Sequence, residues 1–125
     1  MTSNPLCQIT QEDFNCKALL QSVESPVFNH TFQFSVFPKE EFVIVDTNNY
    51  FKNYIPYIYQ GRKIVIKHTW IAEKNQHTVV VGRGENQAGY FTLSFMSRLT
   101  GSAVFFDFKL EGDKLQIVKT YTGDY

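Results

Sequence analysis

The sequence has no excess of charge of either sign. Twelve Lys and Arg residues balance twelve Asp and Glu residues, so the formal net charge at pH 7 is zero, and the basic residues are spread along the chain. A protein that binds a nucleic-acid duplex needs a basic stripe that neutralises phosphates. We therefore expect no nucleic-acid partner.

Long apolar runs are also absent. Runs such as 64–66 and 79–81 have the length of a strand, whereas a helix needs about 20 apolar residues to cross a bilayer. We therefore expect no membrane span. The chain does not open with a basic segment followed by an apolar one, as a secretory signal does. A processed chain would have lost such a signal, so a cytoplasmic location and a periplasmic or secreted one both stay open.

Cysteine is scarce, and the two residues present, Cys7 and Cys16, allow two interpretations. A disulfide between them would tie the N-terminal arm to the following helix. It would also indicate a periplasmic or secreted protein, because such bonds persist in oxidising compartments. Two reduced thiols would suit the cytoplasm. No His or Cys lies nearby at the spacing of metal ligands, so we predict no metal site.

Motifs for catalysis or cofactor binding are few. Residues 82–84, Gly-Arg-Gly, and Gly89 resemble a phosphate-binding loop, but a strand pattern follows where such a loop needs a helix. We interpret them as a hairpin connection and predict no cofactor. If His68 faced a pocket, Asp107 could orient it for proton transfer in a small lyase, isomerase or hydrolase. This pair is the catalytic candidate of a sequence that otherwise favours a non-enzymatic function.

The most regular pattern lies between residues 90 and 121. Apolar and polar residues alternate there in three runs, which predicts three consecutive antiparallel strands. Gly-Asp at 112–113 predicts a two-residue hairpin turn, because such turns need backbone angles that glycine adopts without strain. The turn sets two cross-strand pairs on one face, Leu110 with Leu115 and Phe108 with Ile117.

The chain before this meander predicts one helix and further strands. Residues 1–9 have no period and are expected to form an extended arm. Residues 10–25 have apolar positions at helical spacing, and Pro26 ends the helix because the residue before a proline is pushed out of the helical region. Antiparallel sheet is then predicted over 27–121, including an alternating strand at 28–36.

Three segments of this predicted sheet have distinct patterns. Residues 42–45 are apolar on both faces, which predicts a central or doubly covered strand. The strand that contains His68 and Trp70 is expected to pair with Val79 and Val81 of the next one. Residues 50–59 are assigned to a short helix or an irregular edge, because their spacing is helical but the segment contains a proline.

The expected fold is a single α+β domain over residues 1–125. An N-terminal amphipathic helix packs on a strongly curved antiparallel meander of about six or seven strands, or on a partly closed barrel. This arrangement resembles cystatin-like and NTF2-like domains, in which a meander cradles an N-terminal helix. The sequence contains no motif of either family, so the resemblance implies a fold and no site.

Tyrosines concentrate between residues 50 and 59, where four of the seven lie. Tyrosine offers a large contact area with a polar tip, so the cluster suits a protein-binding surface, and nearby basic residues would steer an acidic partner. An aromatic minicore that closes one end of the sheet explains the cluster equally well. The candidate binding residues are Tyr50, Tyr54, Tyr57, Tyr59, Trp70, Arg62, Lys63 and Lys67.

These features predict recognition of another protein, as by an inhibitor or an immunity-type antagonist that acts by steric occlusion. Two alternatives stay open. One is the catalytic pair described above. The other is a small apolar ligand on the concave sheet face, with walls formed by Phe91, Phe95, Phe106, Phe108 and Trp70. A homodimer formed by pairing of sheet edges is compatible with the charge pattern.

Overall fold

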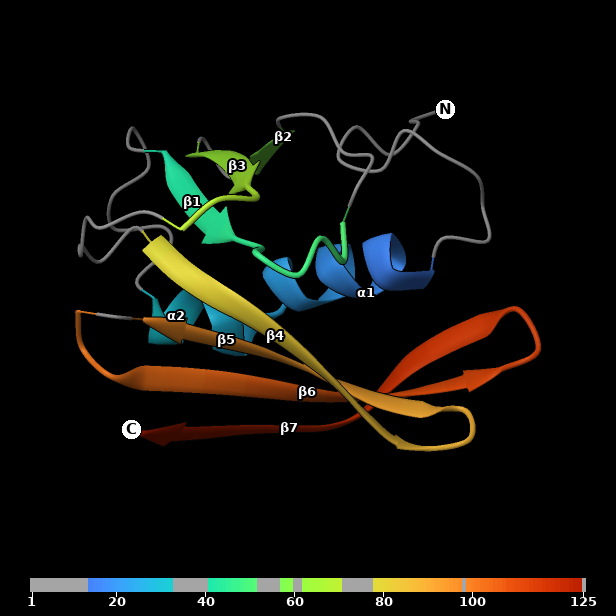
Figure 1. Cartoon of the computed structure of the whole chain (residues 1–125). Coiled ribbons are helices and arrows are strands. Elements are labelled where there is room, and N and C mark those ends of the chain that lie inside the picture. The colour runs from blue at the N-terminus through green and yellow to red at the C-terminus, as the bar shows by residue number, and fades with distance from the viewer. Residues whose placement is uncertain are drawn as a thin grey trace.

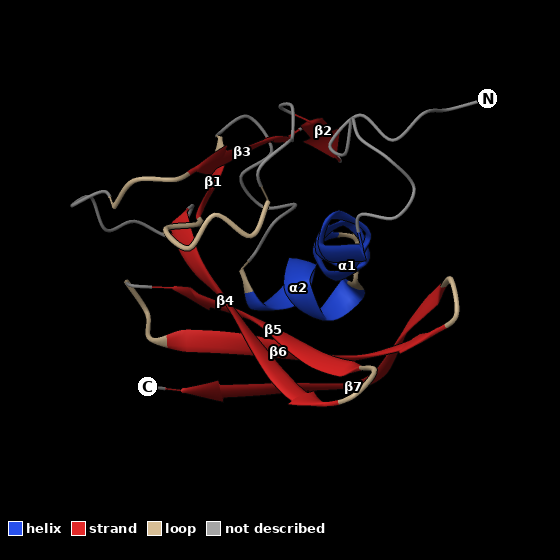
Figure 2. Ribbon diagram, turned by 45° about the vertical axis from the view of Figure 1, so that its right-hand side comes forward, coloured by secondary structure: helices blue, strands red, loops and turns tan. Residues whose placement is uncertain are grey.

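The computed structural model describes residues 14–32, 41–51, 57–59, 62–70, 78–97 and 99–124. Two short helices lie on the concave side of a sheet of seven strands that curls into a half-barrel (Figures 1 and 2). The elements are α1 (Phe14–Val23), α2 (Pro26–Thr31), β1 (Phe42–Val45), β2 (Tyr57–Tyr59), β3 (Arg62–Lys67), β4 (Thr78–Gln87), β5 (Tyr90–Ser97), β6 (Ser102–Glu111) and β7 (Lys114–Asp124). The predicted α+β fold with N-terminal helix and curved sheet is confirmed.

The predicted arm at 1–9 and the start of the predicted helix at 10–13 lie outside the described residues. Within the described part, α1 begins at Phe14 and ends at Val23, just before the predicted stop at Pro26. Its buried side chains include Ala18 and Leu19. No helix of the described residues is long and apolar enough to span a membrane.

The strand order is β2-β3-β1-β4-β5-β6-β7. Strands β4 to β7 form the predicted antiparallel meander, but β1 runs parallel to both of its neighbours, β3 and β4. The prediction of an entirely antiparallel sheet is therefore wrong at β1. The prediction that residues 42–45 form a central strand is confirmed, because Ile44 and Val45 point to opposite faces and both have no exposed surface.

The hairpin between β6 and β7 has the predicted register. Leu110 lies opposite Leu115, Phe108 lies opposite Ile117, and Gly112 has a positive φ of 64°. The register shifts after Phe108, since the next pair is Asp107 with Lys119. A local turn and a hydrophobic face were sufficient to specify this part of the fold.

The predicted strand at 28–36 is wrong over its first part, where the structure has α2. Pro26 occupies the start of this helix, and Ser25 Oγ accepts a hydrogen bond from the backbone N–H of Val27 at 3.3 Å. Proline fits the first turn of a helix because the N–H that it lacks would have no helical partner there. The Ser-Pro pair that ends α1 therefore begins a second helix. Residues 33–36 lie outside the described residues.

The expected pairing of the His68 strand with Val79 and Val81 is also wrong. β3 ends at Lys67 and pairs with β1, and β4 lies on the other side of β1. Alternation of apolar and polar residues predicts a strand but not which strands lie beside it. It therefore could not predict that β1 lies between β3 and β4. Of the doubtful segment 50–59, residues 57–59 form the edge strand β2, and 52–56 lie outside the described residues.

The core fills the concave side of the sheet. Phe28 of α2 lies with its ring centre 5.1 Å from that of Phe95 on β5, and Phe95 lies 6.0 Å from Phe106 on β6. Phe91 stacks on Phe108 at 5.2 Å. These five rings are between 0% and 3% exposed, so the helices and the phenylalanines occupy most of the space that a deep apolar pocket would need.

Candidate functional site

An open cleft of about 340 Å³ lies where α1 begins, at one end of the concave side of the sheet. Ligand pockets in proteins usually measure about 300–1,000 Å³. We call it the Arg83 cleft, after the cation among its lining residues. Its lining includes Phe14 and Asn15 of α1, Arg83 and Glu85 of β4, and Tyr90 and Phe91 of β5.

Alternation along β4 brings Arg83 into this cleft. Val79 and Val81 point into the core, and the next residue on the same face is Arg83. The guanidinium carbon lies 4.3 Å from the ring centre of Phe91, within the range of a cation–π interaction. The side chain is 21% exposed. The alternation that directs Val79 and Val81 into the core therefore also directs Arg83 to the same face of β4, just beyond the edge of the core.

Two hydrogen bonds hold the guanidinium in a defined orientation. Arg83 Nε donates to Asn15 Oδ1 at 2.8 Å, and Nη1 donates to Glu85 Oε2. A guanidinium has five N–H groups, and these bonds use one on Nε and one on Nη1. Glu85 is 69% exposed at the rim, so this carboxylate approaches a largely buried cation from the solvent side.

Two further cations lie beside the aromatic rings of the cleft. Lys17 Nζ lies 5.1 Å from the ring centre of Phe14, and Lys109 Nζ lies 6.0 Å from that of Tyr90. Lys109 also forms an ion pair with Glu111 at 3.7 Å. Flexible ammonium groups near a cleft raise the local concentration of anions.

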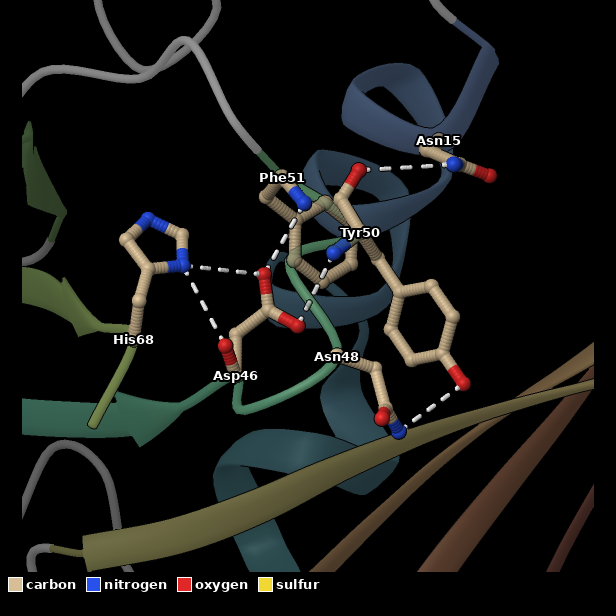
Figure 3. A network of polar contacts seen from close by, with 6 residues as sticks. All are labelled: Asn15, Asp46, Asn48, Tyr50, Phe51 and His68. Atoms are coloured by element: carbon tan, nitrogen blue, oxygen red, sulfur yellow. Dashed lines mark hydrogen bonds and ion pairs between the residues drawn. The ribbon is translucent and has the colours of Figure 1, made fainter. Parts of the chain in front are cut away.

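Hydrogen bonds join the loop after β1 to α1, as Figure 3 shows for Asn15 and Tyr50. Asn15 Nδ2 donates to the carbonyl oxygen of Tyr50 at 3.4 Å, while Asn15 Oδ1 accepts from Arg83. The Tyr50 hydroxyl accepts from Asn48 Nδ2 at 3.2 Å and donates to the carbonyl oxygen of Arg83 at 3.4 Å. Asn15 therefore links the loop to the guanidinium and is a positioning residue for Arg83.

Asp46 holds this loop in shape. Its carboxylate is buried and accepts two backbone N–H bonds, from Tyr50 at 3.0 Å and from Phe51 at 2.9 Å. His68 Nδ1 lies 3.5 Å from Asp46 Oδ2 and 3.2 Å from the Asp46 carbonyl oxygen. Figure 3 shows the carboxylate between the two amides and the imidazole. A buried carboxylate with this many partners is suited to fixing a loop.

The structure gives His68 and Asp107 different partners. Three strands, β1, β4 and β5, separate β3, which ends just before His68, from β6, which carries Asp107. Asp107 lies on the sheet face opposite the core and accepts hydrogen bonds from Thr92 Oγ1 at 2.6 Å and from the Tyr121 hydroxyl at 3.4 Å. Burial, together with the charge and hydrogen bond of Asp107, raises the pKa of Tyr121. The two predicted partners are not brought together.

The predicted aromatic surface is divided among different environments. Tyr50 and Tyr59 are partly buried and pack against the core, whereas Trp70 is 59% exposed. Tyr54 lies outside the described residues, and for Tyr57 and Arg62 only the strand positions are described. Lys63 and Lys67 are exposed on the outer face of β3. Ile58, which the sequence did not single out, is 69% exposed and pairs with Lys63.

The disulfide between Cys7 and Cys16 stays one of two interpretations. Cys16 is buried on α1, and the described residues include no free cysteine, but Cys7 lies outside them. His77 lies outside them too. Within the described ranges no group of three or more His, Cys, Asp or Glu residues could hold a metal ion.

Sequence reasoning missed Arg83 and Asn15 as site residues. Arg83 was assigned to a hairpin connection, although the alternation of Val79 and Val81 continues to it and predicts an inward position. No sequence signal connects Asn15 to Arg83, which lies 68 residues away. No protein-family model, curated protein or solved structure matches the chain.

Proposed function

We propose that this domain binds a small organic ligand in the Arg83 cleft. The observation that carries the proposal is a largely buried guanidinium, oriented by Asn15 and Phe91, at the side of an open cleft with aromatic walls. Ligand sites are typically apolar hollows with a few oriented polar groups. A small-ligand site on the concave sheet face is one alternative that the sequence leaves open. The site proposed here lies at the end of that face instead of in its middle.

The packing of the core excludes a ligand from the middle of the concave face. Phe95, Phe106 and Phe108 were expected to wall a pocket, but they have no exposed surface. Of the predicted wall, Phe91 reaches the cleft. A ligand therefore has to sit between α1 and the turn from β4 to β5, with its polar end toward Arg83.

A fragment screen by two-dimensional NMR tests this proposal. We expect small aromatic compounds to shift the backbone amide signals of Gly89 and Tyr90, which line the cleft. Arg83→Ala should weaken binding strongly. Lys114→Ala, which removes the same charge at the exposed tip of β6 and β7, should leave it unchanged. The folded state of each variant is checked by its unfolding transition.

Two results would contradict ligand binding at this cleft. One is a screen in which no compound shifts the Gly89 and Tyr90 signals. The other is a set of shifts confined to Ala103 and Gly123, which line a separate cleft of about 450 Å³ beside α2.

A second proposal is recognition of another protein, with the domain acting as an inhibitor or immunity-type antagonist by steric occlusion. Ile58 and Trp70 have the two largest exposed fractions among the exposed large apolar side chains described, 69% and 59%. Lys63 and Lys67 lie on the outer face of β3 between them in sequence, and would steer an acidic partner. Exposed aromatic residues are common anchors of protein interfaces.

Replacing both Ile58 and Trp70 by serine should weaken capture of such a partner by roughly 30-fold or more, because even a single interface anchor contributes about 2 kcal/mol or more. Affinity is measured by surface plasmon resonance with the partner isolated from the source cells. Leu99→Ser is the matched control, since Leu99 is 53% exposed in the turn before β6. Equal affinities of the double variant and the control would exclude this surface.

A further inference from the structure

We infer that the ligand of the Arg83 cleft is a monocarboxylate with a ring or short apolar body, and that its carboxylate replaces Glu85 as the partner of Arg83. This inference rests on the proposed function and names the chemical class of the ligand. Three features of the cleft support it: the difference in burial between Arg83 and Glu85, the fixed plane of the guanidinium, and the composition of the walls.

The difference in burial makes the resident ion pair replaceable. The Arg83 side chain is 21% exposed, whereas that of Glu85 is 69% exposed. A largely buried cation requires an anionic partner. A carboxylate that reaches it from solvent, however, contributes little net free energy, because solvent screens the pair and the long side chain loses freedom. A ligand carboxylate inside the cleft would meet the same cation with less water around it.

The orientation of the guanidinium suits a planar anion. The guanidinium carbon lies over the ring of Phe91, 4.3 Å from its centre, and Nε donates to Asn15 Oδ1, so the terminal nitrogens have a defined direction. Carboxylates bind such a guanidinium edge through two parallel hydrogen bonds. Lysine, with a compact charge on a flexible stem, would not impose this geometry.

The walls limit the charge of the ligand and define its body. Arg83 is the cation among the described lining residues, and Glu85 is the acid. Within this lining one guanidinium balances one negative charge, and of the two ammonium groups beside the cleft Lys109 is already paired with Glu111, which favours a monocarboxylate over a phosphate dianion. Phe14, Tyr90 and Leu110 supply two rings and an aliphatic side chain, against which a ring or a short alkyl chain would pack, while Phe91 lies behind Arg83.

Matched pairs of probes test the inference. Benzoate, cyclohexanecarboxylate and 3-phenylpropionate are each titrated against the corresponding neutral amide, with the Gly89 and Tyr90 amide signals as the readout. We expect the carboxylates to bind about tenfold more tightly or better than the amides, because charge-assisted hydrogen bonds are roughly twice as strong as neutral ones. Arg83→Gln should remove this preference and leave weak binding of both members of a pair.

The Glu85→Gln variant tests whether Glu85 competes with the ligand for Arg83. Because the side chain that competes for Arg83 loses its charge, the carboxylates should bind several-fold more tightly, while the amides should bind with unchanged affinity. Asp113→Asn, on an exposed residue of the β6–β7 tip, changes the net charge by the same amount and in the same direction as Glu85→Gln, and as the control it should leave both affinities unchanged.

The outcomes separate the two proposals. If amides bind the cleft as tightly as carboxylates, or if Glu85→Gln weakens the carboxylates, the ligand class is wrong although the cleft binds small molecules. If neither member of any pair shifts the Gly89 and Tyr90 signals, the proposed function fails and the inferred ligand class fails with it.

Discussion

Replacing Phe28 by alanine is expected to lower the free energy of unfolding by about 3–5 kcal/mol. Phe28 has no exposed surface. Its ring centre lies 4.9 Å from that of Phe32, 5.1 Å from that of Phe95 and 5.5 Å from that of Phe42. Truncation would open a cavity where α2, β1 and β5 meet. Urea unfolding followed by circular dichroism at pH 7 measures the loss.

His30→Ala is the matched control for this variant. In the strand that alternation predicts, His30 and Phe28 would face the same side, whereas in α2 His30 is exposed and Phe28 is buried. We expect His30→Ala to change stability by less than about 0.5 kcal/mol. Similar losses at both positions would contradict the helix. If Phe28→Ala fails to fold, Phe28→Leu should give a smaller loss in the same direction.

Replacing Asp46 by alanine is expected to lower the free energy of unfolding by about 2–4 kcal/mol, because a buried backbone N–H that loses its acceptor costs about 1–3 kcal/mol and a part-buried one costs less. The two groups are those of Tyr50 and Phe51, at 3.0 and 2.9 Å from the carboxylate. Asp46→Asn should cost less, since the amide retains one acceptor oxygen. Urea unfolding at pH 7 again measures the difference.

The Asp46 variant should also disturb the Arg83 cleft. The carbonyl oxygen of Tyr50 accepts from Asn15, which in turn orients Arg83, so a loosened loop should shift the NMR signals of the Asn15 side-chain amide and the Arg83 Nε–H. Thr47→Ala, on an exposed residue of the same loop, is the control. An Asp46→Ala protein as stable as Thr47→Ala would show that the carboxylate does not hold the loop.

Local patterns predicted the parts of the fold in which neighbours in sequence are neighbours in space. The β6–β7 hairpin needed only the Gly112 turn and an alternating apolar face, and both specify one register. The body of α1 needed only helical spacing and the stop before Pro26. At α2 the same reasoning failed, because alternating aromatics suggested a strand while Ser25 and Pro26 begin a helix.

The sequence by itself determined an α+β domain with an N-terminal helix, a C-terminal antiparallel meander and β1 as a central strand. Tertiary structure alone decided that β1 runs parallel between β3 and β4, that His68 meets Asp46 instead of Asp107, and that Asn15 orients Arg83 across 68 residues. The physical reason is that turn chemistry and periodicity act over a few residues. Strand order and side-chain partners depend instead on which distant surfaces bury each other, and no local pattern records that choice.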